Sequence, residues 1–578
     1  MTQIIELTRK LRILALGLAV GYAAMTATPA ATNNETIRVV SADLKQTSGP
    51  LNTMFKRCVG AGRANEGLRA DWQRQLALAR KECGFEYIRF HGLFTDDMGV
   101  YRDYNGKPEY NWQYIDELFD FLQSIGMKPF VELGFMPQGL ASGSRTIFWW
   151  KGNVTPPRDM QKWADFMRAF TLHVQERYGH DEVKTWYFEV WNEPNLDGFW
   201  AGTQQQYFDL YAASARAIKS VSPDYKVGGP GTAGCGWIKE FLKFCETNQS
   251  PVDFVSTHTY GVESGFLDET ATHGTALSSN PNSIFGEVKW VRQMISESAF
   301  RKAELHFTEW SSSYTPADPM HDSYHSAAYI LDKLKHCDDA AQSMSYWTFT
   351  DIFEEPGPRW EAFHGGFGLM NQQDIKKSSY YAYQFLNRLG ATELQSNDRA
   401  SWICTDKNGG VQALVWDFTN TFPKSNMINQ VYFKRDLPAQ PKGKVALNLV
   451  NVPKGKYTME VSRVGYRVND AYATYRDLGS FQLLLSLQDT DALRLFCDSL
   501  LGPIESGEGH YGGELMRSLE AFIECNGQWE AAARRLYCHR HTLRYRIRRI
   551  EELTGRDLTS ARDRIEFWLA LRGSEIVQ

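Results

Sequence analysis

The stretch Trp-Tyr-Phe-Glu-Val-Trp-Asn-Glu-Pro at Trp186–Pro194 is the strongest structural signal in the chain. Its aromatic and β-branched residues predict a buried strand, and the apolar run stops abruptly at Asn192, Glu193 and Pro194. A carboxylate therefore stands at the C-terminal end of a strand. In a parallel α/β barrel that end carries the reactive groups, because the loops that leave the strands form the open mouth of a packed cylinder.

A second stretch, Leu305-His306-Phe307-Thr308-Glu309-Trp310, repeats this design with a short apolar strand that ends on Glu309. On its own, a Glu before a Pro, such as Glu193, can simply begin a turn. Two carboxylates at two strand ends are what cleavage of a glycosidic bond requires, since one protonates the leaving oxygen and the other attacks the anomeric carbon or activates water. We therefore expect Glu193 and Glu309 to act as a pair.

Strand-like runs alternate with helical patterns in the number that forms a (β/α)8 TIM barrel, so the expected fold class is α/β. The strands are expected at Arg57–Ala61, Tyr87–Phe90, Lys128–Leu133, Trp186–Val190, Lys226–Gly229, Phe254–Thr257, Glu304–Thr308 and Ser343–Phe349. Apolar residues at helical spacing separate most of them, at Glu66–Cys83, Tyr114–Ile125, Met160–Tyr178, Gln204–Ser220 and Ser323–Asp338. On this count Glu193 follows the fourth strand and Glu309 the seventh.

With these motifs the chain resembles glycoside hydrolase family 39, whose known members are β-xylosidases and α-L-iduronidases. The resemblance implies that Trp191-Asn192-Glu193-Pro194 carries the acid/base, that Phe307-Thr308-Glu309-Trp310 carries the nucleophile, and that Asn192 binds the sugar 2-hydroxyl. It also implies an accessory β-sandwich beside the barrel, to which the strand expected at Thr36–Ala42 belongs. Lys407-Asn408-Gly409-Gly410 is a hairpin signal within the same sandwich.

Polar and aromatic residues at the other strand ends are expected to line the sugar pocket, as matching positions do in that family. They are Arg89 and His91 after strand two, His258 and Tyr260 after strand six, Tyr314 after strand seven, and Trp347, Asp351, Glu354 and Glu355 after strand eight. Arg89 and His91 have an alternative place beneath the site, where either orients a glutamate without touching substrate. Glu354 and Glu355 are not separable in the sequence, and only one is expected to face inward.

The expected reaction sets opposite demands on the two glutamates. Glu309 must be ionised to attack, and Arg89 or a tyrosine hydroxyl can hold it so by donating hydrogen bonds. Glu193 must be protonated, and both burial and the charge of Glu309 raise its pKa. If the carboxyl groups lie about 5–5.5 Å apart, the reaction retains configuration. The expected substrate is a xylo-oligosaccharide or other small glycoside, attacked from its end, and no metal or organic cofactor is expected.

The length of 578 residues predicts several domains. Residues 1–31 resemble an export signal, with a basic start at Arg9, Lys10 and Arg12 and an apolar run too short to span a membrane. The alternative for this segment is a short buried or amphipathic helix. With a working signal the protein is secreted or periplasmic, and without one it is cytoplasmic. The remaining domains are expected at 32–390 for the barrel, 391–480 for the sandwich and 481–578 for an all-α domain.

Composition adds two expectations. The net charge of −5 gives no global reason to expect nucleic acid. Nine cysteines occur without any Cys-x-x-Cys pair, so neither a zinc site nor a redox motif is indicated and most are expected to be buried as small apolar side chains.

The C-terminal segment differs in its charge pattern from the chain as a whole. It resembles the C-terminal helix-turn-helix of PucR-type transcription regulators, through the runs Asn526–Leu536, His539–Arg546 and Ile550–Gly555. A recognition helix is expected to begin at Arg540. Seven arginines and no acidic residue occur between Arg534 and Arg549, a pattern that suits DNA phosphates or a solvated face. The candidate DNA-binding residues are Arg540, His541, Thr542, Arg544 and Arg546.

The two halves predict incompatible locations, because an exported glycosidase meets no operator DNA. Three resolutions stay open: a fusion joined near Gly479, a signal that does not work, or an inert tail. A join there falls inside the sandwich and is expected to leave some edge strands unpaired. Two functions follow, a retaining glycoside hydrolase of β-xylosidase type or a sugar-responsive transcription regulator with a barrel sensor. Intact Glu193 and Glu309 favour the hydrolase. The oligomeric state is open.

Overall fold

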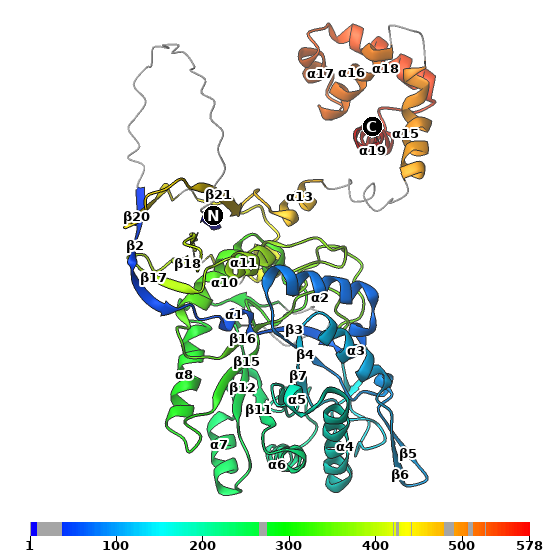
Figure 1. Cartoon of the computed structure of the whole chain (residues 1–578). Coiled ribbons are helices and arrows are strands. Elements are labelled where there is room, and N and C mark those ends of the chain that lie inside the picture. Colours follow the sequence, from blue (N-terminus) through cyan, green and yellow to red (C-terminus); the bar gives the residue numbers. More distant parts are fainter. Residues whose placement is uncertain are drawn as a thin grey trace. The chain divides into compact units, whose positions relative to one another are not determined.

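The chain forms two compact units, Met1–Ala473 and Thr474–Gln578, whose boundary falls within helix α13 (Ala471–Leu478). This computed structural model describes residues 2–8, 37–264, 274–419, 421–423, 427–440, 442–478, 490–506, 512–525 and 527–577. In the described part, the larger unit contains a closed barrel and a seven-stranded sheet, and the smaller unit is built of helices (Figure 1).

The barrel closes through parallel pairing of neighbouring strands, which confirms the predicted (β/α)8 fold. Its wall runs through β3 (Cys58–Arg63), β4 (Tyr87–His91), β7 (Lys128–Glu132), β10 (Tyr187–Glu189), β11 (Lys226–Thr232), β12 (Phe254–Tyr260), β15 (Glu304–Ser311) and β16 (Ser343–Tyr346), and returns to β3. Each predicted strand matches one of these. The last strand ends earlier than Phe349, because its pairing with β15 stops at Trp310 opposite Tyr346.

Helices cover the outside of the barrel where the apolar spacing predicted them (Figure 1). The matching helices are α2 (Ala70–Cys83), α3 (Gln113–Ser124), α4 (Met160–Tyr178), α6 (Gln204–Val221) and α10 (His325–His336), and α7 (Ile238–Thr247), α8 (Phe285–Ser296) and α11 (Ser378–Asn387) join them. Local capping residues determine where several of these helices begin. Thr203 and Gln206 form a capping box at the start of α6, and the Asp159 side chain caps α4.

The two ends of the barrel differ in chemistry. Near their N-terminal ends the strands contribute a buried apolar cluster of Cys58, Tyr87, Phe130, Tyr187 and Phe254. The C-terminal ends instead carry buried charged and polar side chains, among them Arg89, Glu193 and Glu309. One end is therefore closed by apolar packing, and the polar groups gather at the other, as expected for a TIM-barrel site.

The predicted accessory strands lie in one seven-stranded sheet, in the order β20 (Lys444–Val450), β2 (Ile37–Pro50), β17 (Thr392–Ser396), β18 (Ser401–Thr405), β19 (Val411–Val415), β1 (Thr2–Thr8) and β21 (Thr458–Val464). The strand expected at Thr36–Ala42 is thus confirmed as part of β2. The expected hairpin joins β18 to β19 at Lys407–Gly410, with Gly409 at φ 78°.

Strand β1 occupies the position between β19 and β21 and pairs antiparallel with both. Its residues, Thr2–Thr8, belong to the predicted export signal, whose other residues through position 31 lie outside the described part, as do the proposed join at Gly479 and residues 480–489. Edge strand β21 carries exposed apolar side chains at Met459 and Val461. No helix of the described residues has both the length and the apolar character needed to cross a bilayer.

After the end of α13, the described residues of the smaller unit form α15 (Thr490–Glu505), α16 (Gly512–Glu524), α17 (Trp529–Arg535), α18 (Arg540–Thr554) and α19 (Ala561–Val577). Its core contains Leu519, Phe522, Leu543, Ile547 and Phe567. Helix α18 begins at Arg540, as predicted, after a turn through Tyr537 at φ 49°. The helix-turn-helix predicted for this segment is confirmed.

Candidate active site

Three strands on one side of the barrel, β10, β12 and β15, position the residues of the candidate site. Glu193 follows β10, His258 and Tyr260 lie in β12, and Glu309 lies in β15. Glu193 has a φ of 44°, and its backbone N–H donates to the carbonyl of Gly231 at 2.8 Å. A non-glycine residue in this region of backbone conformation is held there by its surroundings, a feature common at functional sites. The strand-to-loop turn therefore aims the Glu193 carboxyl toward β12 and β15.

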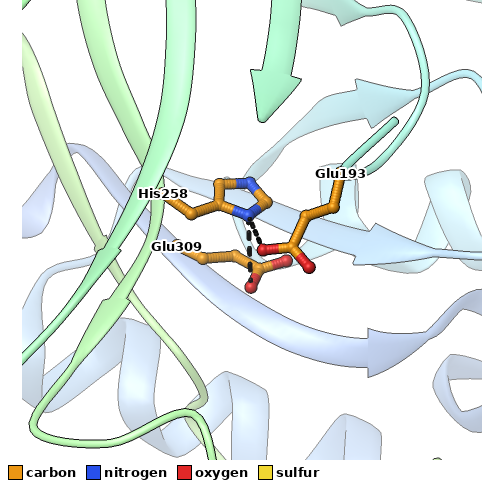
Figure 2. A group of neighbouring side chains, drawn as sticks. All are labelled: Glu193, His258 and Glu309. Carbon is orange, nitrogen blue, oxygen red and sulfur yellow. Dashed lines mark hydrogen bonds and ion pairs between the residues drawn. The ribbon is translucent and has the colours of Figure 1, made fainter. Parts of the chain in front are cut away.

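Glu193 and Glu309 converge on His258 (Figure 2). Nδ1 of His258 lies 2.8 Å from Oε1 of Glu193 and 3.5 Å from Oε2 of Glu309. One ligand atom from each of the three side chains lies within 4.8 Å of the others. The two predicted carboxyl groups are therefore brought together.

Arg89 organises the carboxylates beneath this pair. The fully buried guanidinium donates to Oε1 of Glu309 at 2.7 Å and to Oδ1 of Asn192 at 2.8 Å. It also pairs with Glu189 at 2.6 Å and with Glu132 at 2.9 Å. The bond from Arg89 fixes the Asn192 side chain with its amide oxygen toward the guanidinium.

Glu132 and Glu189 are site residues that the sequence reasoning missed. Both are fully buried, and Thr308 donates to Oε1 of Glu189 at 2.7 Å. The sequence did contain a signal for both residues, because each is a carboxylate at the last position of a barrel strand, β7 or β10. They were overlooked because they stand within apolar runs and not in a polar strand-end motif.

The structure separates the two glutamates that follow β16. Glu355 comes within 3.4 Å of Nε2 of His91, whereas Glu354 pairs with Arg63 at 2.8 Å and Arg69 at 3.1 Å. His91 also packs against the Trp347 ring, with ring centroids 4.8 Å apart. Glu355, His91 and Trp347 thus lie at the site, and Glu354 belongs to an ion-pair cluster beside it. Asp351 lies apart, bonded to the buried Lys377 ammonium at 2.6 Å.

The electrostatics favour different protonation of the two central glutamates. Burial and the charge of Glu309 raise the pKa of Glu193 well above its ordinary value. Burial also raises the pKa of Glu309, but Arg89, His91 and the Tyr260 hydroxyl oppose that shift. Burial, with the charges of Arg89 and His91, lowers the pKa of His258 well below its ordinary value. These surroundings favour the proton on Glu193 over Glu309 and favour the uncharged form of His258.

A cavity of about 400 Å³ opens on Glu193. Tyr260 and Tyr314 line it, and their rings meet edge to face at 6.0 Å. Its other walls are Asn195, Leu196, Ala233, Gly234 and Val262. Aromatic side chains together with the Glu193 carboxyl group suit a sugar ring, whose carbon face is apolar and whose edge carries hydroxyls.

Glu193, His258 and Glu309 are also a donor set of the kind that binds a divalent metal ion. Their unlike proton affinities and the bonds from Arg89 and Tyr260 to Glu309 match the demands of proton transfer and nucleophilic attack more closely. We therefore assign no metal to these side chains.

The candidate DNA-binding residues lie on α18 and differ in their surroundings. Arg540, His541, Thr542 and Arg544 are exposed, and the Arg544 guanidinium stands 5.5 Å from the centre of the Trp529 ring. Arg546 is largely covered and pairs with Glu514 of α16. The first four residues therefore face solvent, whereas Arg546 ties two helices of the unit together.

Comparison with known proteins identifies the family. The profile of glycosyl hydrolases family 39 matches residues 38–493. The chain belongs to this family. A β-xylosidase of Geobacillus stearothermophilus is 44% identical over 371 residues, which are 63% of this chain and 73% of that protein. As a family 39 member with these similarities, the chain is a glycosidase.

Solved structures agree with the family 39 fold. A monomeric β-xylosidase from Caulobacter crescentus CB15 is 45% identical with a TM-score of 0.73, over 77% of this chain and 89% of that one. The GH39 enzyme from Xanthomonas axonopodis pv. citri is 44% identical with a TM-score of 0.74, over 78% and 89%. The profile of the PucR C-terminal helix-turn-helix domain matches residues 515–573 of this family 39 chain.

Proposed function

We propose that the larger unit is a retaining, exo-acting β-xylosidase in which Glu309 is the nucleophile and Glu193 the acid/base. The observation that carries this proposal is the convergence of two carboxyl groups with oxygens within 4.8 Å of each other, of which only Glu309 has hydrogen bonds from Arg89 and Tyr260 opposing the rise of its pKa. An inverting mechanism needs a water between the carboxyl groups and a separation of about 6.5–9.5 Å.

In the first step a carboxylate oxygen of Glu309 attacks the anomeric carbon while Glu193 gives its proton to the leaving oxygen. Arg89 and Tyr260, 2.7 and 2.6 Å from the Glu309 oxygens, hold that carboxylate ionised and oriented for attack. The bond from the anomeric carbon to the leaving oxygen breaks, and an ester to Glu309 forms.

The ester removes the negative charge of Glu309, so the pKa of Glu193 falls and its carboxylate can accept a proton from water. That water attacks the anomeric carbon and releases Glu309. His258, uncharged and 2.8 Å from Glu193, keeps a hydrogen-bond partner for this carboxyl group in both of its protonation states. Two inversions at one carbon retain the configuration of the sugar.

The glycone is proposed to be neutral xylose. The relatives named β-xylosidases support this choice. The cations that touch the central glutamates support it as well, since Arg89 and His91 already face Glu132, Glu189 and Glu309. A uronate carboxylate placed there would add a negative charge to a buried and already acidic cluster, which is costly without a new cation.

The test is hydrolysis of an aryl β-D-xyloside by the full chain, with the first-formed anomer followed by NMR. Glu309→Gln should abolish turnover, and Glu193→Gln should slow it by about 100-fold or more, the usual contribution of acid/base catalysis. With Glu193→Ala, azide should restore turnover and yield the β-azide, whereas with Glu309→Ala it should yield the α-azide. An α-xylose first product from the wild-type chain overturns the retaining mechanism.

A second function is proposed for the smaller unit, because its sequence matches a helix-turn-helix domain and α18 exposes Arg540, His541, Thr542 and Arg544. We propose that α18 binds duplex DNA. Arg540→Ala and Arg544→Ala should weaken binding of a fluorescent duplex and reduce its dependence on salt. Arg535, which pairs with Glu524, is the matched control. If xylose changes the affinity for DNA, the result favours the sugar-responsive regulator. If xylose leaves that affinity unaltered, the result favours an enzyme with a separate DNA-binding unit.

Where the protein works is a further proposal, namely export directed by residues 1–31. Cleavage near residue 31 would remove Thr2–Thr8, which form β1. Cell fractionation with mass measurement of the N-terminus tests it. Recovery of the protein from the cytoplasm with an intact N-terminus would contradict export and would place the chain in the compartment that contains DNA.

A further inference from the structure

A buried carboxylate–imidazole pair lies behind the candidate nucleophile. Nδ1 of His91 is 2.6 Å from Oε2 of Glu132, and the same oxygen is 2.9 Å from the Arg89 guanidinium. Glu132 is fully buried, and His91 is 2% exposed. The other ring nitrogen, Nε2, faces outward to Oε1 of Glu309 at 3.6 Å and to Oε1 of Glu355 at 3.4 Å.

The balance of charge in this cluster requires more than Arg89. That single guanidinium pairs with the carboxylates of Glu132, Glu189 and Glu309, none more than 5% exposed. Three negative charges around one positive charge are costly to bury, because each carboxylate gives up its hydration. A second cation beside Glu132 and Glu309 relieves that cost, and His91 is the residue that touches both.

We propose that Glu132 is a positioning residue that keeps His91 a permanent cation, so that the imidazolium and Arg89 together hold Glu309 ionised for attack. Glu132 contacts Nδ1 of His91, whereas Nε2 of the same ring faces Glu309, so Glu132 acts on Glu309 through His91. The proposal rests on the nucleophile role proposed for Glu309, but the charge of His91 can be measured without it.

The charged and polar groups around His91, Glu132 and Glu309 come from several strands of the barrel. Glu132 is at the end of β7, Glu309 is in β15, and Glu355 follows β16. Glu193 and His258 meet Glu309 from β10 and β12. The further polar partners of Glu309 are Arg89 and the Tyr260 hydroxyl.

The proton affinity of His91 agrees with this reading. Burial by itself disfavours an imidazolium, but the charges of Glu132 and Glu309 and the hydrogen bonds to Glu132 and Glu355 outweigh it and raise the pKa of His91 to about 10. The pKa of His258, a buried ring whose carboxyl partner Glu193 has a raised pKa of its own, is shifted the opposite way by burial and by the charges of Arg89 and His91. Glu132 makes the largest of the contributions that raise the pKa of His91.

The pH dependence of kcat/KM for an aryl β-D-xyloside distinguishes a cationic from a neutral His91, because Glu132→Gln should shift the acidic limb of that profile differently in the two cases. If His91 is a cation, removing its partner lets the ring lose its proton, Glu309 loses a neighbouring positive charge, and the acidic limb moves to higher pH by about 1 unit or more. If His91 is neutral, the variant only removes a negative charge near Glu309. The acidic limb then moves to lower pH or stays, and either result overturns the proposal.

Glu304→Gln is the matched control. It also removes a carboxylate that contacts a buried imidazole, since Oε2 of Glu304 is 3.0 Å from Nε2 of His306. Glu304 lies at the opposite end of β15 from Glu309, roughly 16 Å away along the strand. Its variant should leave the acidic limb where the wild-type chain has it, and an equal shift in both variants contradicts a specific role of Glu132.

A second measurement keeps the proposal open to refutation if Glu132→Gln fails to fold or if the chain proves inactive on xylosides. Nitrogen NMR of histidine-labelled full-length protein, with His91 assigned by its loss in His91→Gln, reports the protonation of each ring nitrogen. Both nitrogens of His91 should carry protons from pH 5 to pH 8. A His91 that titrates near its ordinary range overturns the proposal whatever the enzymatic activity is.

Discussion

At the scale of single residues, the hydroxyl of Tyr260 should set the lower pH limit of activity. It donates to Oε2 of Glu309 at 2.6 Å, a bond that favours the ionised carboxyl group. In Tyr260→Phe the pKa of Glu309 rises, so the acidic limb of kcat/KM should move to higher pH. Tyr314→Phe, which changes the ring packed against Tyr260, is the control and should leave the limb in place. A limb that Tyr260→Phe leaves unchanged contradicts this role.

Thr308 should contribute to stability through a charged acceptor. Its hydroxyl donates to Oε1 of Glu189 at 2.7 Å, and both side chains are fully buried. Thr308→Val leaves a buried carboxylate oxygen without that donor, which should lower the free energy of unfolding by about 1–3 kcal/mol in denaturant titrations. Thr171→Val is the matched substitution, since that hydroxyl donates only to the helical carbonyl of Met167. Equal losses in the two variants would show that burial, and not the carboxylate, determines the effect.

At the scale of elements, the arginines of α18 should divide into two classes. Arg546 is 23% exposed and pairs with Glu514 of α16, so Arg546→Gln should destabilise the smaller unit by about 1 kcal/mol, as expected for a partly covered ion pair. Arg548, exposed on the same helix, is the control, and Arg548→Gln should leave the midpoint unchanged. Thermal unfolding followed by circular dichroism measures both, and a larger loss for Arg548→Gln contradicts the assignment.

At the scale of the whole molecule, the two units should lose their structure separately. Ile547 is 1% exposed in the core of the smaller unit, so Ile547→Ala should lower the unfolding temperature of that unit through a loss of about 2–5 kcal/mol. Hydrolysis of an aryl xyloside should continue above that temperature, because the candidate catalytic side chains and the residues that contact them belong to the larger unit. Ile330→Ala, equally buried in the barrel core, should instead lower the temperature at which activity disappears. Joint loss of both signals in Ile547→Ala would contradict independent units.

The sequence by itself determined the elements and the two central carboxylates. Strand and helix periods are local properties, so the eight barrel strands, the covering helices and the start of α18 at Arg540 followed from short windows of sequence. Glu193 and Glu309 could be named because each ends an apolar run, and a parallel barrel collects such ends at one mouth. The helix-turn-helix followed from a motif of the same local kind.

The tertiary structure decided which side chains share a contact. Glu132 meets His91, Glu354 turns to Arg63 while Glu355 turns to His91, and Arg546 turns to Glu514. Strand β1 pairs with residues more than 400 positions away, which no short window of sequence can indicate. The physical reason is that charge pairing and strand pairing act through space over a few ångströms, so they depend on how distant segments pack and not on the order of residues along the chain.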